Sequence, residues 1–173
     1  MSKTSIRFSL DPNDIDRAIG ELKKFEREFL NKVEQFTEGL ALLGLKEASV
    51  RFSSAMYDGI NDSDVRLDTI EKGYAIVARG EAVAFIEFGA GVYHNPSEPY
   101  PITRPDGVVG IGEYGSGKGK RRAWYYKGEV GSSGERQKNG AVKTRGNPAA
   151  MPMWYASEEI KNNVLKLARE VFG

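Results

Sequence analysis

The chain has 173 residues, of which 40% are hydrophobic and 28% are charged, with a net charge of +1 and no cysteine. These values are ordinary for a soluble globular protein of one domain. The lack of cysteine excludes disulfides, thiolate metal sites and a cysteine nucleophile, and no apolar run approaches the ~18 residues that span a membrane. The first ten residues lack the apolar core of a secretory signal, so we expect assembly inside a cell.

The charge is unevenly distributed along the chain. Residues 1–103 hold 12 basic and 17 acidic side chains, a net of −5, whereas residues 104–146 hold 10 and 4, a net of +6. Residues 147–173 are balanced. A local basic segment of this kind usually faces either solvent or a partner.

The N-terminal segment predicts a short strand followed by a helix. Residues 5–10 alternate the apolar Ile6, Phe8 and Leu10 with polar neighbours, as a half-buried strand does. The next residues, DPND (11–14), are typical of a helix start. An aspartate there can accept hydrogen bonds from free amides, and a proline suits the first helical position.

A stripe of apolar residues, mostly three or four positions apart, extends over residues 15–43 and predicts an amphipathic helix. The stripe packs either on the protein's own sheet or in a coiled coil or bundle, and the lack of sustained heptads favours the sheet. Gly39 and Gly44 each weaken a helix by roughly 1 kcal/mol relative to alanine, so we expect a break or bend between them. A second helical stretch is expected through residues 48–56, ending in the turn YDGINDSD (57–64).

The next residues predict an antiparallel hairpin. Residues 65–70 alternate in polarity, EKG (71–73) is a turn signal, and residues 74–78 are short, apolar and β-prone. Residues 82–88 are apolar and are ambiguous between a strand and one or two helical turns.

Residues 89–147 are expected to form an extended arm. They contain 13 of the 20 glycines, and a structureless segment this long is uncommon inside a compact domain. Apolar residues within it, such as those of AWYY (123–126), predict a short β ribbon that is ordered chiefly by contact with another molecule.

The remaining residues, 148–173, predict a C-terminal helix. The whole chain therefore predicts a single α+β domain over residues 1–173. A long N-terminal helical region and the C-terminal helix pack on a small antiparallel sheet, and a long Gly-rich arm extends from it. The helices and hairpin occupy residues 1–88, and the arm (89–147) separates them from the C-terminal helix. One face of the C-terminal helix carries Ile160, Val164, Leu167, Ala168 and Val171.

Two sequences in the arm imitate phosphate-binding loops. GIGEYG (110–115) spells G-x-G-x-x-G, but the residues after it cannot open a stable helix, and GEYGSGK (112–118) has Gly119 where Ser or Thr should hold magnesium. His94, the single histidine, is interpreted as a surface or interface residue, since no G-x-S-x-G elbow accompanies it. No catalytic, cofactor or metal site is predicted, and we expect no enzymatic activity.

A basic cluster in the arm combines cations with aromatic side chains. KGKRR (118–122) supplies Lys118, Lys120, Arg121 and Arg122, and AWYYK follows it directly. Three interpretations stay open: a platform for single-stranded nucleic acid, a solvated arm, and a contact with the acidic body of another subunit.

Glu87 is a carboxylate inside the apolar run AFIEF (84–88). Burying it without a partner would cost several kcal/mol. It is therefore expected either to face solvent or to accept hydrogen bonds, from the turn amides of residues 89–91 or from an arginine.

The order of motifs along the chain resembles that of one family. AFIEFGAGVY (84–93) is followed by a Gly/Pro-rich loop, by an aromatic cluster and by TRGNPAAMPMWYASEEI (144–160), which leads into an amphipathic helix. This order resembles the head–tail joining family of tailed bacteriophages, the small neck or tail-completion proteins. Many relatives have Phe where Met153 stands. The residues that carry the resemblance are Glu87, Phe88, Gly89, Gly91, Trp124, Tyr125, Tyr126, Pro152, Met153, Trp154 and Ala156.

The resemblance implies an α+β fold and a ring, usually sixfold, between the capsid portal and the tail, with no catalysis and no cofactor. The implied partners are sister copies, the adjoining connector, and tail-tube or tail-terminator proteins, with non-specific contact between residues 118–122 and channel DNA. No membrane is involved. The implied location is the virion neck, after assembly in the cytoplasm of the bacterial host. The alternative function is a basic-arm nucleic-acid-binding module.

Overall fold

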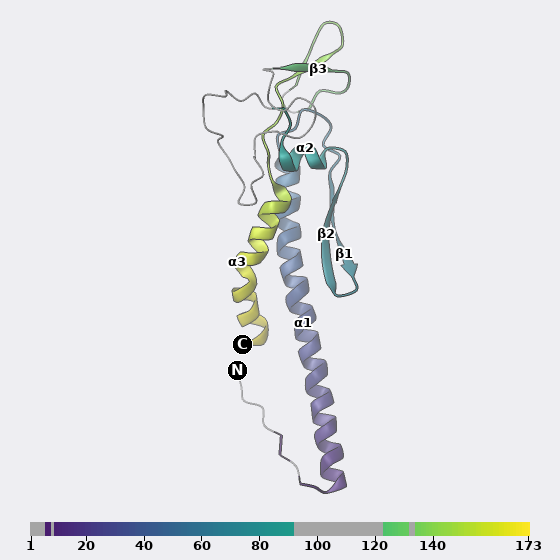
Figure 1. The fold of residues 1–173 in the computed structure, drawn as a ribbon, viewed down its shortest axis with the longest axis vertical. Helices are drawn as coiled ribbons and strands as arrows, with labels where there is room; N and C mark the ends of the chain where they lie inside the picture. Colours follow the sequence, from purple (N-terminus) through teal and green to yellow (C-terminus); the bar gives the residue numbers. More distant parts are fainter. Residues whose placement is uncertain (1–5, 8, 92–122, 132–133) are drawn as a thin grey trace.

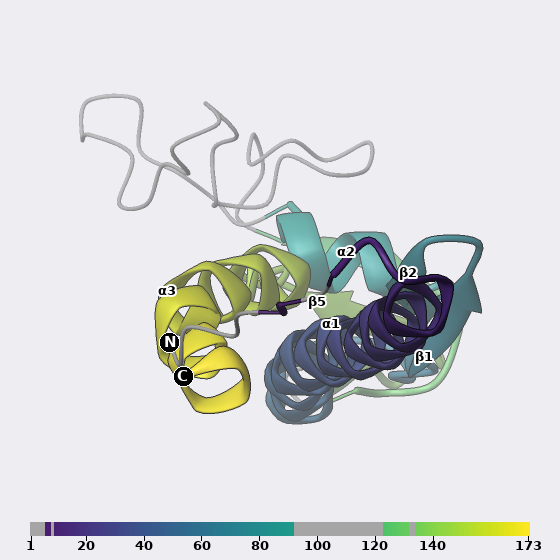
Figure 2. The ribbon, with the colours of Figure 1, turned by 90° about the horizontal axis from the view of Figure 1, so that it is seen from below.

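The computed structural model describes residues 6–7, 9–91, 123–131 and 134–173. The architecture is α+β, as predicted. One long helix, α1 (Pro12–Ser54), forms the axis of the molecule, with helix α3 (Pro152–Phe172) on one side and the hairpin of strands β1 (Asp64–Ile70) and β2 (Gly73–Arg79) on the other (Figure 1). The view from below shows the same order of α3, α1 and hairpin (Figure 2).

The start of α1 agrees with the prediction. The Asp11 side chain accepts a hydrogen bond of 2.9 Å from the Asn13 amide, and Pro12 occupies the first helical turn. Asp14 in that turn accepts a 2.7 Å hydrogen bond from the Ser9 hydroxyl. This hydrogen bond, with help from Arg17, holds the pKa of Asp14 below its usual value.

The predicted strand at residues 5–10 is wrong for its described residues, 6, 7, 9 and 10, none of which is in a strand. Ser9 donates hydrogen bonds to Asp14 in the first turn of α1. The described part of this segment therefore stabilises the start of the helix and does not pair in a sheet.

The break predicted between Gly39 and Gly44 is also wrong, because α1 continues without interruption through both. A side chain at Gly39 would meet Leu167 of α3, and one at Gly44 would meet both Ile160 of α3 and Ile76 of β2. The two glycines thus let neighbouring elements approach the helix closely. The packing gained there offsets the lower helix propensity.

Helix α3 packs along the upper half of α1 and ends beside the middle of it. Phe172, the last residue of α3, has its ring centroid 6.0 Å from that of Phe29 and 5.7 Å from that of Phe36. The apolar stripe of α1 therefore packs on α3 as well as on the hairpin.

The hairpin has the predicted turn, with strand pairing from Asp64↔Arg79 to Ile70↔Gly73. The ambiguous segment after it is helical and forms α2 (Val83–Phe88), which lies across the upper end of α1 (Figure 1).

The core is small and lies where α1 ends and α3 begins. Five residues from three helices and the loop before α2 make it, and partly buried residues of both strands pack around it. These five residues are Ala48, Phe52, Ala82, Ile86 and Ala156.

The described residues of the predicted arm include a three-stranded antiparallel sheet in the order β3-β5-β4. Its strands are β3 (Trp124–Tyr126), β4 (Glu135–Arg136) and β5 (Val142–Thr144). The predicted β ribbon is thus present. None of the helices in the described ranges combines the length and apolar character needed to cross a membrane.

Replacing Gly44 by leucine should lower the free energy of unfolding by about 1–3 kcal/mol, because the added side chain overpacks the site between Ile160 and Ile76. Gly20→Ala on the same helix is the control, since nothing lies within 4 Å of its new methyl group. That change should leave stability unchanged or raise it by up to roughly 1 kcal/mol. Urea unfolding followed by circular dichroism measures both, and equal effects of the two variants would contradict the packing role of Gly44.

Candidate functional site

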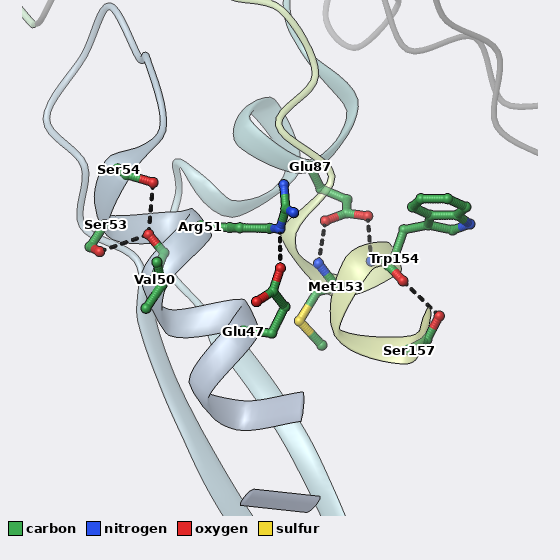
Figure 3. A network of polar contacts seen from close by, with 9 residues as sticks. All are labelled: Glu47, Val50, Arg51, Ser53, Ser54, Glu87, Met153, Trp154 and Ser157. Atoms are coloured by element: carbon green, nitrogen blue, oxygen red, sulfur yellow. Dashed lines mark hydrogen bonds and ion pairs between the residues drawn. The ribbon is translucent and has the colours of Figure 1, made fainter. Parts of the chain in front are cut away.

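The two motifs that carry the family resemblance meet at the junction of α2 and α3. Glu87 in the last turn of α2 is buried, and its Oε2 accepts a 2.8 Å hydrogen bond from the Met153 amide (Figure 3). Its Oε1 accepts a longer bond, 3.3 Å, from the Trp154 amide. The carboxylate therefore caps the N-terminus of α3.

Glu87 of α2 supplies this cap because the residues at the start of α3 supply none of their own. The residue at the capping position, Met151, is in the left-handed conformation (φ 51°, ψ 46°), and its side chain accepts no capping hydrogen bond. Pro152 has no amide hydrogen, so the next two amides are the first donors. A carboxylate at that point also meets the positive end of the helix dipole. The interpretation of Glu87 as exposed is thus wrong, and these two donors lie 66 and 67 residues further along the chain.

Backbone bonds join the same two segments next to the cap. Ala90 and Asn147 exchange hydrogen bonds of 2.9 and 3.0 Å, and the Ala150 amide donates to the Ile86 carbonyl at 2.9 Å. The Asn147 side-chain amide adds a 2.8 Å bond to the Phe85 carbonyl.

Two glycines of the first motif adopt conformations that favour glycine. Gly89 has φ 72° and Gly91 has φ 57°. Since a side chain is strained at such angles, the glycines are needed to turn the chain out of α2.

A hollow of about 420 Å³ lies beside the cap, between α2 and the first turns of α3. Most of its lining is apolar, and it includes two aromatic side chains that the resemblance had singled out, Phe88 and Trp154. Its lining residues are Val83, Ala84, Glu87, Phe88, Met153, Trp154 and Ser157.

The neighbouring side chains hold this end of α3 against α1. The Arg51 guanidinium lies 3.6 Å from the centroid of the Tyr155 ring, and its Nε is 2.5 Å from Oε1 of Glu47. The Tyr155 ring in turn meets Trp154 edge to face, with centroids 4.8 Å apart. Figure 3 shows Arg51 and Glu47 on α1 facing the start of α3.

The aromatic cluster of the arm lies on a different part of the molecule. The Tyr126 hydroxyl donates to the carbonyl of Asp58 and contacts that of Glu129, and burial, followed by the nearby Asp58 charge, raises the pKa of Tyr126. Tyr125 is largely exposed, and Trp124 pairs with Thr144 in the sheet. The junction residues and the arm residues thus form two sites, not one.

Asp58 connects the described part of the arm to the rest of the protein through hydrogen bonds. Its carbonyl accepts from the Gly131 amide at 3.0 Å, and its buried side chain accepts from the Thr144 hydroxyl. These described residues of the predicted arm therefore have contacts within the same chain, and the ordering of the arm by another molecule stays a prediction.

Sequence reasoning missed Asp58, and also missed Asn61 and Asp62 in the same turn. The Asn61 side chain donates to the Phe52 carbonyl at the end of α1. Asp62 accepts 2.8 Å bonds from the amides of Glu81 and Ala82, at the start of α2. The high content of Asp and Asn in residues 57–64 signals such caps, although it does not identify their partners.

Several predicted residues lie outside the described ranges. They are His94, the two loop motifs within residues 110–118, and the basic residues Lys118, Lys120, Arg121 and Arg122. Within the described ranges, no three His, Asp or Glu side chains gather closely enough to hold a metal ion.

Comparison with known proteins adds no relative. The chain matches no family model, no curated protein and no solved structure.

Replacing Asp62 by alanine should destabilise the protein at neutral pH, because the carboxylate caps α2. The amides of Ala82 and Glu81 hold the pKa of Asp62 below 3.8, so its ionised form is the stabilising one. This contribution is complete above 3.8 and is lost as the pH falls through the lower pKa of the folded state. Urea unfolding at pH 7 and at several values below 3.8 measures the difference from wild type, which should shrink on acidification. Glu71→Ala in the hairpin turn is the control, and a difference for Asp62→Ala that is independent of pH would contradict the cap.

Proposed function

We propose that this chain is a structural neck protein of a tailed bacteriophage, whose copies form a ring that joins the capsid portal or connector to the tail. The observation that carries the proposal is the junction around Glu87. The two motif segments that resemble the head–tail joining family are separated by more than fifty residues, yet they bond to each other. A shared structural unit explains why the two motifs occur together.

The junction has the properties of a docking site between subunits. The cap by Glu87 and the Arg51–Tyr155 stack fix the start of α3, so that Trp154 is held beside Phe88 at an open, mostly apolar hollow. A prearranged aromatic pocket is the kind of surface at which a few side chains contribute most of the binding energy.

Charge favours contact between copies. The first 103 residues carry a net charge of −5 and residues 104–146 carry +6. A basic arm of one subunit therefore attracts the acidic body of the next, at a range of about 10 Å in ordinary salt. On this proposal the partners are sister copies in a ring, expected to be a hexamer, together with the adjoining connector and tail-tube or tail-terminator proteins. No membrane is involved. The place of action is the virion neck, after assembly in the host cytoplasm, and the role is structural rather than enzymatic.

One observation favours the alternative function, nucleic-acid binding by the basic arm. Tyr125 is 61% exposed on β3, and the exposed Lys127 directly follows the end of that strand. An exposed ring beside cations can stack on a base while the cations attract phosphate.

Replacing Trp154 by serine should abolish or weaken assembly at least tenfold, because it removes the aromatic wall of the hollow while leaving the Glu87 cap, which uses the backbone amide. Sedimentation velocity of the purified protein, alone and mixed with connector and tail-tube proteins, measures the assembly. Leu165→Ser is the matched control, since Leu165 is an exposed apolar residue of the same helix away from the hollow.

Two results would contradict the proposal. One is a wild-type chain that stays monomeric with every neck and tail component. The other is DNA binding by the monomer that weakens steeply with salt and is lost when Lys118, Lys120, Arg121 and Arg122 become serine, which would favour the alternative function. Equal loss of assembly in the Trp154 and Leu165 variants would reject the hollow as the docking site.

A further inference from the structure

The N-terminal half of α1 projects beyond α3 and the hairpin (Figure 1). Helix α3 ends at Phe172, beside Phe29, and α1 begins at Pro12. At 1.5 Å per residue, the projecting part is roughly 25 Å long.

The apolar stripe of α1 continues onto this projecting half. Further along the helix, α3 covers the stripe, at Phe36 for example. On the projecting half Ile15 is half-buried and Ala18 is buried, but the five large apolar side chains from Ile19 to Leu30 are 44–56% exposed. The rings of Phe25 and Phe29 stack with centroids 6.4 Å apart. Scattered exposed residues are normal, whereas a continuous stripe marks an interaction surface. The exposed members of the stripe are Ile19, Leu22, Phe25 and Phe29, with Leu30 at its edge.

The charges along the projecting half identify what covers the stripe. Residues 11–21 carry four acidic side chains and one basic, a net of −3, whereas residues 22–32 carry four basic and two acidic, a net of +2. A second copy of the same helix laid parallel would bring like charges together. Laid antiparallel, each acidic half faces the basic half of the other copy.

We propose that two copies of this chain pair through the projecting halves of α1, antiparallel and centred near Leu22. Such a contact is self-complementary and closes on itself as a two-fold dimer. The exposed stripe has five apolar side chains per copy, compared with ~20–30 residues a side in a standard interface, so we expect a weak dimer that exchanges with monomer. The inference does not rest on the ring function, because it uses a surface at the opposite end of α1 from the Glu87 junction.

The antiparallel arrangement brings the start of the second helix to the end of α3. In the antiparallel pair, the N-terminus of the second helix approaches the C-terminal end of α3, where Arg169 lies in the last turn. The partner's acidic first turn and positive helix end both complement the C-terminal end of α3.

The dimer is tested by sedimentation equilibrium over micromolar to millimolar concentrations of the full chain. Leu22→Glu, at a site 55% exposed, should raise the dimer dissociation constant at least tenfold. Leu42→Glu is the matched control. Leu42 is 50% exposed on the same helix, and twenty residues at 100° each place it on nearly the opposite face. The Leu42 variant should change the constant less than twofold. A wild-type chain that stays monomeric throughout, or equal effects of the two variants, would overturn the proposal.

The orientation is tested separately, with a spin label on the single cysteine of Asn13→Cys, since the natural chain has none. In the antiparallel pair the two labels lie roughly 27 Å apart along the helix axis, because each is nine residues from the centre. In a parallel pair they would lie only about 10 Å apart, the distance between neighbouring helix axes. A distance distribution from pulsed electron paramagnetic resonance that peaks at the short value would overturn the antiparallel arrangement.

Discussion

The buried carboxylate of Glu87 is the interaction on which the upper half of the molecule depends. It supplies the cap that the sequence at the start of α3 lacks, since Met151 makes no capping hydrogen bond and Pro152 has no amide hydrogen. The cap joins α2 to α3 at the edge of the core formed by Phe52 and Ile86. A neutral apolar residue in its place would remove the acceptor of two partly buried amides, and leaving such donors unsatisfied costs more than the hydrogen bonds themselves contribute.

Polar side chains also form hydrogen bonds at or near the ends of other helices and strands. Asn61 donates to the last turn of α1, nine residues earlier, and Asp62 accepts from the Ala82 amide just before α2. Asp58 accepts from Thr144 in the sheet of the arm, 86 residues away. Among the described residues the fully buried apolar cluster is small, so these polar contacts help to fix the relative positions of elements that have little apolar surface between them. A rigid junction follows, and rigidity is what a repeated contact between subunits requires.

The sequence predicted those elements that depend only on residues close together in the chain. The Asp11–Pro12 start of α1, the turn at residues 71–73 and the C-terminal helix all follow from the sequence and are present in the structure. The continuity of α1 did not follow, because the role of Gly44 depends on Ile160 and Ile76, which only the fold brings to it. For the same reason the donors to Glu87 and the partners of Asp58 were not predictable. Their contacts span more than sixty residues, and no local pattern encodes a pairing at that distance.

The most direct measurement of the central claim is amide hydrogen exchange at Met153 and Trp154, in the wild-type chain and in Glu87→Ala, with the exposed Glu26→Ala as control. If the carboxylate caps α3, both amides are strongly protected in the wild type. In Glu87→Ala they lose that protection, and the free energy of unfolding falls by about 1–3 kcal/mol. Two amides that exchange rapidly in the wild type, or that stay protected without the Glu87 carboxylate, would contradict the account.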